Sequence, residues 1–501
     1  MQLSLEKREL YKLHSFCVPR AEIGVESDIV LPDYLGDIER ILKCTITPRV
    51  SSKRIENNRV AISGTAFARV VYLVSDGNIA SFETQIPFSK NFEISAEGED
   101  CYASVRVKCE YINCRALSPR RFEIRSALEA NVCVHTRQVC SVVNNADPDA
   151  VEVKKQKIQT ISPISHTCEN FTVAEEYELV GEPISSVVRM TASPTVLDSK
   201  AVSGRLIVKG EIALCIVYLT EEGVLKTFEQ KVPVNHIMTA RDVEEEDIVD
   251  LSLDILRMSA EPITNSSTNE VTVEIFLEAC ADAKRREEVE LVTDAYSVGY
   301  ESDVRYVDLD IPTFTSKLVK QHAFTIAPEV DYTEILDVFA EVVNCKTEVN
   351  SQGEVMCESE ISVAFLLKDG EGTPFISEKM HNAQFSLGAD MCYKEALCDC
   401  LVSVLSAAIS TNKRGADIVL AATCNLNRSE HIEAVQSFDV DESRPKTRDS
   451  KNALTLYFAE EGEDVFDIAK KYNTSARAVM DENSLTGLHI DAQRPILIPI
   501  I

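Results

Sequence analysis

The chain has 501 residues, a net charge of −30 and 45% hydrophobic side chains, the composition of a globular protein of three or four domains. Such an acidic chain repels phosphate groups, so we expect neither nucleic acid nor an anionic lipid surface as its partner. Its apolar runs are all far shorter than the roughly 18 residues of a membrane-spanning helix, so we expect no membrane insertion.

The N-terminal segment, Met1 to Ser15, is charged throughout and lacks an apolar core. A secretory signal needs such a core, so we expect the protein to stay in the cytosol. The sixteen cysteines are scattered without a Cys-x-x-Cys pair, which favours a reducing compartment and predicts no metal site.

Individual cysteines support that interpretation. Cys398 and Cys400 fall on one face of a strand, which suits neither tetrahedral zinc nor an unstrained disulfide. Cys109, Cys215 and Cys424 lie within apolar runs. We expect these three to behave as small buried hydrophobic residues.

An internal repeat fills most of the chain. Residues 41–87 align without gaps with residues 187–233, and a weaker match places Val70–Leu73 on Val363–Leu366. We therefore expect three diverged copies of one domain. We place a lead segment at 1–29, the copies at 30–140, 175–284 and 325–437, and a small C-terminal domain at 452–501.

Each copy is predicted to be mostly β. Apolar residues alternate over 60–74 and again over 206–218, as in a long strand with one buried face. Gly64 and Gly210 within these runs indicate bulges, and the turns at 76–77, 222–223 and 369–370 indicate hairpins. Several antiparallel strands per copy favour a β-sandwich. Short helices are expected to open the copies, at 36–42, 184–190 and 333–342.

Polar segments at 141–160 and 439–452 are predicted to be linkers. The acidic run Glu244–Asp247 recurs at Glu97–Asp100, lacks the alternating ligands of a calcium loop, and is predicted to be a solvated loop. The sequence contains no phosphate-binding loop or nucleophile elbow, and its eight histidines are scattered. We therefore expect no enzyme, no catalytic residues and no cofactor.

The first copy also carries motifs of a known domain: Leu31-Pro32-Asp33, residues 37–42, Val71-Tyr72-Leu73, Ile86-Pro87-Phe88 and residues 117–121. These resemble the SPOCS domain, which occurs in tandem in SipL-type spore coat morphogenesis proteins. The resemblance implies a scaffold in the mother-cell cytoplasm, at the forespore surface, that brings coat proteins onto the forespore.

The last fifty residues predict a small βααβ domain. Apolar residues repeat at helical spacing from Val465 to Tyr472, and Asn473-Thr474-Ser475 ends that helix and can cap a second one. Gly462–Ala469, Asn483-Ser484-Leu485 and Leu497-Ile498-Pro499 resemble the LysM domain, which binds N-acetylglucosamine polymers or, less often, proteins.

The resemblance to LysM implies a binding groove between two loops. In SipL-type proteins this domain engages the coat basement-layer ATPase, so that ATPase and other coat proteins are the implied partners. The alternative is a peptidoglycan-binding protein of the cell wall or spore cortex. Phe466 is either core or an anchor on the groove rim. The expected groove residues are Leu454, Gly462, Glu463, Asp464, Val465, Phe466, Leu485, Thr486, Gly487, Leu488 and Ile490.

Overall fold

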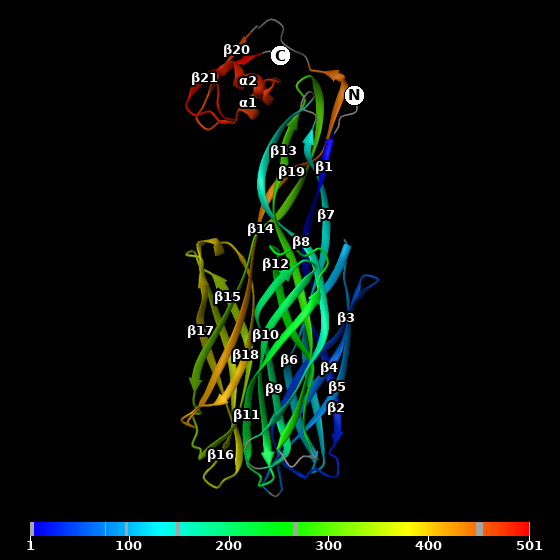
Figure 1. Ribbon diagram of the computed structural model, residues 1–501, viewed down its shortest axis with the longest axis vertical. Coiled ribbons are helices and arrows are strands. Elements are labelled where there is room, and N and C mark those ends of the chain that lie inside the picture. The colour runs from blue at the N-terminus through cyan, green and yellow to red at the C-terminus, as the bar shows by residue number, and fades with distance from the viewer. Residues whose placement is uncertain are drawn as a thin grey trace.

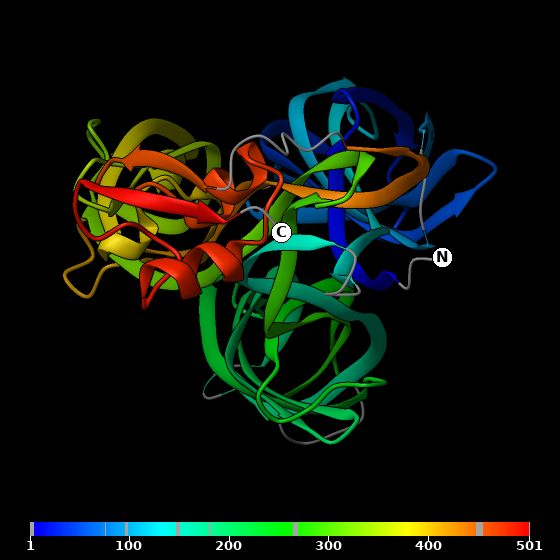
Figure 2. The ribbon, with the colours of Figure 1, turned by 90° about the horizontal axis from the view of Figure 1, so that it is seen from above.

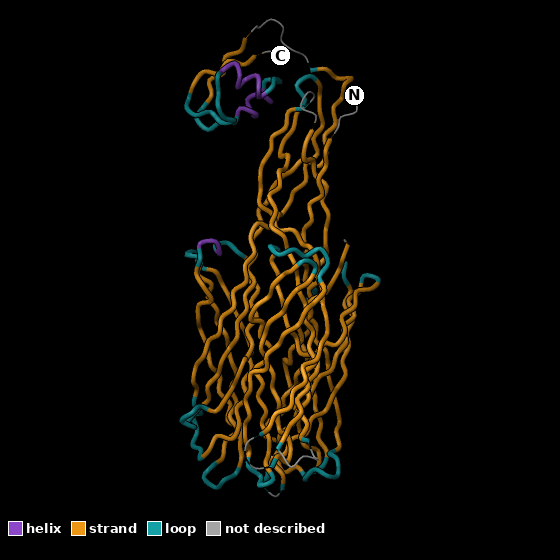
Figure 3. Tube along the Cα trace, viewed as in Figure 1, coloured by secondary structure: helices purple, strands orange, loops and turns teal. Residues whose placement is uncertain are grey.

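The structure is a computed structural model that describes the chain except for residues 1–4, 76, 96–98, 147–150, 180, 182, 264–268, 447–453 and 500–501. Strands dominate it (Figure 3), as expected of a mainly β protein. They form three units, which we call unit one (5–146), unit two (152–296) and unit three (300–445), followed by a C-terminal module (454–499).

Each unit is a sandwich of two antiparallel sheets (Figure 1). Unit one pairs β3 (Ile38–Glu56), β4 (Arg59–Val74) and β5 (Ile79–Glu93) in one sheet. Its second sheet contains β1 (Leu5–Cys17), β2 (Ala21–Val30), β6 (Glu99–Ser118) and β7 (Arg121–Ala146). The segment expected as a lead, 1–29, thus contributes β1 and β2, both of which pair with β7.

Units two and three repeat this order, except that one long strand, β8 or β14, takes the place of β1 and β2. Unit two pairs β9 (Ile184–Val202), β10 (Arg205–Thr220) and β11 (Leu225–Thr239) against β8 (Glu152–Glu178), β12 (Ile248–Pro262) and β13 (Glu270–Tyr296). Unit three pairs β15 (Glu334–Val349), β16 (Glu354–Lys368) and β17 (Pro374–Ala389) against β14 (Tyr300–Ile326), β18 (Leu397–Ile409) and β19 (Ala416–Pro445), with a 3-10 turn at Met391–Tyr393. The prediction of a mainly β fold built from antiparallel sheets is confirmed.

The three units surround a common axis (Figure 2). In β4 the residues from Val60 to Tyr72 alternate toward the sandwich core, yet Val71, on the other face, is also buried. Val71 lies in one apolar cluster with Val217 and Ala364, which hold the matching places in β10 and β16. The central strands therefore bury both faces, one in their own sandwich and one against the other units.

At one end of the units, three long two-stranded ribbons continue into a stalk (Figure 1). They are formed by β1 with the end of β7, by the start of β8 with the end of β13, and by the start of β14 with the end of β19. Val142, Leu291 and Ile432 belong to one buried cluster inside it. The segment 141–160, expected as a linker, is therefore strand at 141–146 and 152–160, and residues 147–150 lie outside the described residues. The first part of 439–452 belongs to β19, and 447–452 lies outside the described residues.

The turn glycines of units one and two behave as predicted. Gly77 and Gly223 have φ of +86° and +78° between paired strands, a conformation that favours glycine. In unit three this conformation belongs to Gly372, not to Gly370. Gly64 packs so closely that an added Cβ would meet the carbonyl oxygen of Arg49, beside a bulge in β3.

The three helices expected at the start of the units are wrong, because β3, β9 and β15 occupy those places. Bulges explain the misleading pattern: β3 shifts register between Ile38 and Arg40 and again between Ile41 and Lys43. Each extra residue interrupts the alternation of period two. Apolar residues then recur at the three- and four-residue spacing of a helix.

The structure contains two disulfides, which the scattered cysteine positions did not predict. Cys17–Cys133 and Cys168–Cys280 join residues that lie directly opposite each other in unit one and unit two. The other twelve cysteines are free thiols. In unit three, the residues at the matching place are Thr315 and Asn427, which share a hydrogen bond of 2.9 Å.

Candidate functional site: the C-terminal module and the inter-unit cavity

The C-terminal module has the predicted βααβ order: β20 (Leu454–Ala459), α1 (Val465–Lys471), α2 (Ala476–Asn483) and β21 (Arg494–Pro499). Asp464 caps α1 by accepting a hydrogen bond of 2.8 Å from the Phe466 amide. The buried Asn483 side chain donates to the carbonyl oxygens of Val479 and Leu497 and accepts from the Leu497 amide. Asn483 therefore fastens α2 to β21, which gives this motif residue a structural role.

The two loops expected to face each other across a groove are joined by backbone hydrogen bonds. Gly462 donates to the Ile490 carbonyl at 2.8 Å, Ile490 donates to Glu463 at 2.9 Å, and Val465 donates to Leu488 at 2.8 Å. These bonds tie the two loops directly to each other.

The eleven expected groove residues separate into classes. Val465, Phe466 and Ile490 are buried; Glu463, Asp464 and Leu485 are half-buried; Gly462, Thr486, Gly487 and Leu488 are exposed. Leu454 pairs with Pro499 at the start of β20. Phe466 is thus placed in the core, and three of the four exposed members, Thr486, Gly487 and Leu488, lie in the loop after α2.

Phe466 is buried partly by the stalk. The ring of Tyr296, at the end of β13, meets the Phe466 ring edge-on at 5.1 Å between centroids, and its hydroxyl donates to the Thr474 carbonyl at 2.8 Å. Tyr296 is itself 2% exposed. The module is therefore docked on the stalk through a shared apolar core.

Charges reinforce this contact. Lys154 of β8 pairs with Asp464 at 2.7 Å and Asp467 at 3.2 Å, while Lys470 pairs with Asp294 at 2.6 Å. Burial opposes the charge of Lys154, but the two aspartates outweigh it and raise the pKa of its amine. Asp464, expected in the binding loop, instead caps α1 and pairs with Lys154 of the stalk.

Sequence reasoning missed the exposed apolar face of β20. Leu456 is 52% and Phe458 68% exposed, whereas Ala459 is buried and Tyr457 packs in the module core. The strand is apolar at both alternating positions, so its pattern could not tell which side faces outward.

A second candidate is the cavity of about 2540 Å³ that the three units enclose. Ion pairs cross between units there: Lys53–Glu278 at 2.6 Å, Lys317–Asp250 at 2.6 Å and Arg106–Asp399 at 3.4 Å. These ion pairs link each unit to the other two across the cavity.

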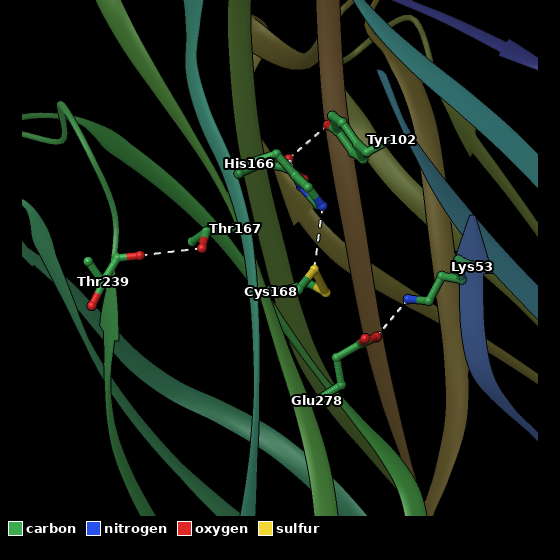
Figure 4. Close-up of a disulfide and its surroundings, with 9 residues drawn as sticks. Lys53, Tyr102, His166, Thr167, Cys168, Thr239 and Glu278 are labelled. Carbon is green, nitrogen blue, oxygen red and sulfur yellow. Dashed lines mark hydrogen bonds and ion pairs between the residues drawn. A yellow bond between two sulfur atoms is a disulfide. The ribbon is translucent and has the colours of Figure 1, made fainter. Parts of the chain in front are cut away.

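Near this cavity, His166 lies beside the Cys168–Cys280 disulfide (Figure 4). Its Nε2 is 3.4 Å from the Cys168 sulfur, its Nδ1 is 2.8 Å from Asp282, and Tyr102 of unit one stacks on its ring. Burial raises the pKa of Asp282, but the hydrogen bonds with His166 and Tyr102 outweigh it, so that pKa is lowered. Because Cys168 is already bonded to sulfur, this group offers no free thiol nucleophile.

The acidic run Glu244–Asp247 is only partly solvated. The Asp247 side chain is 2% exposed and pairs with Arg285 at 2.7 Å, so this residue is structural. The matching residues Glu97 and Gly98 lie outside the described part of unit one. Among the described residues, neither helix is long and apolar enough to cross a membrane.

Comparison with known families finds one match in unit one and one in unit two. Residues 37–117 and 183–263 each match the family model described as the SipL, SPOCS domain. Two tandem stretches of the chain are thus similar to the SPOCS domain. Each matched stretch spans the first sheet of a unit and the strand that follows it, β6 or β12. The matched residues do not include unit three, although it has the same strand order, nor the C-terminal module. No curated protein and no solved structure matches the chain.

Proposed function

We propose that the protein is a non-enzymatic scaffold of spore coat assembly, and that its C-terminal module docks the ATPase of the coat basement layer. The SPOCS domains support a role related to sporulation and the spore coat, in a scaffold-type family. The three units present the body of the scaffold, and the module supplies a docking surface at the end of the stalk.

The outer face of β20 is the observation that carries the docking proposal. Leu456 and Phe458 project from the same side of the strand and pair in register with Leu497 and Pro495 of β21. Exposed large apolar residues on a rigid pair of strands are common anchors of protein interfaces. Phe466, by contrast, is engaged by Tyr296 and is not available while the module is docked on the stalk.

Biolayer interferometry with the purified basement-layer ATPase from the same organism tests the proposal. We expect the full chain to bind and the chain ended after Lys451 to lose binding. Phe458→Ser should weaken binding at least tenfold, which corresponds to about 1.4 kcal/mol. Met391→Ser, at an equally exposed apolar residue of unit three, is the matched control and should bind normally.

Two results would redirect the assignment. Equal binding by the chain ended after Lys451 would mean that the SPOCS units, and not the module, bind the ATPase. Sedimentation of the full chain with purified peptidoglycan, lost in the shortened chain, would favour glycan binding by the module.

A further inference from the structure

Four cysteines of unit three converge between its two sheets. Cys345 on β15 and Cys357 on β16 lie in one sheet, with their sulfurs 3.7 Å apart. Cys400 on β18 faces them from the other sheet, and all three sulfurs lie within 4.8 Å of one another. Cys424 on β19, fully buried, is opposite Cys400 in register. We call these four residues the thiol cluster.

The spacing of Cys345, Cys357 and Cys400 suits a metal–thiolate centre, with Cys424 as a neighbouring fourth thiol. Zinc bound tetrahedrally at about 2.3 Å from each sulfur holds its sulfurs about 3.8 Å apart. The pair Cys345–Cys357 already has this separation. Cys400 and Cys424 are opposite each other, as are the two pairs that form disulfides, yet both remain thiols. The cluster therefore joins thiols from both sheets.

Comparison of the three units shows that the cluster belongs to unit three alone. By strand register, Cys345 and Cys357 occupy the places of Pro48 and Gly64 in unit one, and of Pro194 and Gly210 in unit two. Cys400 and Cys424 occupy the places of Val107 and Ala130, and of Ile255 and Leu277. Core packing at these positions is achieved in the other units without any thiol. All four positions in unit three carry one.

We propose that the thiol cluster binds a soft divalent metal ion, Zn²⁺ foremost, and that the ion ties the two sheets of unit three together. Thiolate sets of this kind select zinc and related transition metals over hard cations. Four thiols contributed by separate strands carry no Cys-x-x-Cys signature. For that reason the sequence did not predict a metal site.

The surroundings fit this role. Ser359, buried beside the cluster, lies with its Oγ 3.5 Å from the Cys357 sulfur and can donate a hydrogen bond to a thiolate there. Cys345 and Cys400 line the inter-unit cavity, which gives an ion a path of entry. Binding would release the thiol protons.

The test uses the full chain purified under reducing conditions. We expect about one zinc ion per chain by inductively coupled plasma mass spectrometry. Exchange with Co²⁺ should produce the intense near-ultraviolet absorption of cobalt–thiolate charge transfer. Cys357→Ser and Cys400→Ser should each reduce the bound metal at least tenfold. Cys392→Ser, at an exposed free thiol of the same unit, and His166→Ala, at the disulfide of unit two, should retain it.

Three results would overturn the proposal. One is a zinc-free chain whose Co²⁺ spectrum lacks the charge-transfer band. Another is retention of zinc by both serine variants. The third is a Cys400–Cys424 disulfide found by mass spectrometry in protein taken from cells. If the serine variants do not fold, the Co²⁺ spectrum of the unaltered chain still decides, because its intensity reports the thiolate ligands directly.

Discussion

The ion pair between Arg189 of unit two and Asp337 of unit three offers the strongest test of the three-unit arrangement. Two guanidinium nitrogens reach the carboxylate at 2.5 and 3.0 Å, and a further bond of 3.2 Å goes to the Val338 carbonyl. Arg189 is 8% and Asp337 5% exposed, so both charges are desolvated only because the units meet. Burial opposes the charge of Arg189, but Asp337 outweighs it and raises its pKa.

Asp337→Ala leaves the Arg189 guanidinium buried with one carbonyl partner. Removing one member of a buried pair costs about 3–5 kcal/mol, because the remaining charge is uncompensated. We expect urea unfolding to show that loss. Hydrogen exchange should be faster in β9 and β15, the strands that carry the pair. The double variant Arg189→Met, Asp337→Leu should recover most of the lost unfolding free energy, since apolar replacements of a buried pair are often neutral or stabilising.

Asp250→Ala is the matched control, because the Lys317–Asp250 pair also joins units two and three but is roughly a quarter exposed. It should cost about 0–1 kcal/mol. An equally small loss for Asp337→Ala would mean that water reaches Arg189 and that units two and three do not meet as described.

Further predictions concern single contacts. Burial raises the pKa of Asp247, but the hydrogen bonds from Arg285 and the Glu244 amide outweigh burial and lower that pKa. The ionised Asp247 therefore stabilises the fold above the unfolded carboxyl pKa of about 3.9. This stabilisation is lost as the pH falls through the lower pKa of the folded state. In urea unfolding, the difference in unfolding free energy between the unaltered protein and Asp247→Ala should therefore shrink below about pH 4. Gly77→Val should cost at least about 1–2 kcal/mol through its positive φ while leaving ATPase binding unchanged. Tyr296→Ala should release the module from the stalk, seen as faster hydrogen exchange in α1, and unchanged exchange would contradict the docked arrangement.

The repeat, the sandwiches and the turns could be predicted because each rests on local chemistry. Alternation over 60–74 identifies a strand, and Gly77 identifies its turn, without knowledge of distant residues. Bulges defeated the same reasoning at 36–42, because two extra residues in β3 imitate a helical spacing. The stalk was missed because the polar residues of 141–160 indicate a linker, while the apolar residues between them are buried only by the other two ribbons.

The candidate sites likewise divide into features set by nearby residues and features set by distant ones. The βααβ order of the module follows from its own fifty residues, but the burial of Phe466 depends on Tyr296, 170 positions earlier in the chain. The thiol cluster likewise depends on four strands that meet only in the folded unit. Spacing along the chain reports contacts within an element and says nothing of partners that the fold supplies.

Closure around one axis fixes how many units this protein can use. In an open array of repeats, one more copy lengthens the molecule and one fewer shortens it. Here Val71, Val217 and Ala364 each cover the other two, so a two-unit version would leave apolar faces bare and a fourth unit would find no vacant place. Evolution of such a chain can therefore proceed by divergence among three members, as the thiols of unit three illustrate, rather than by gain or loss of a member.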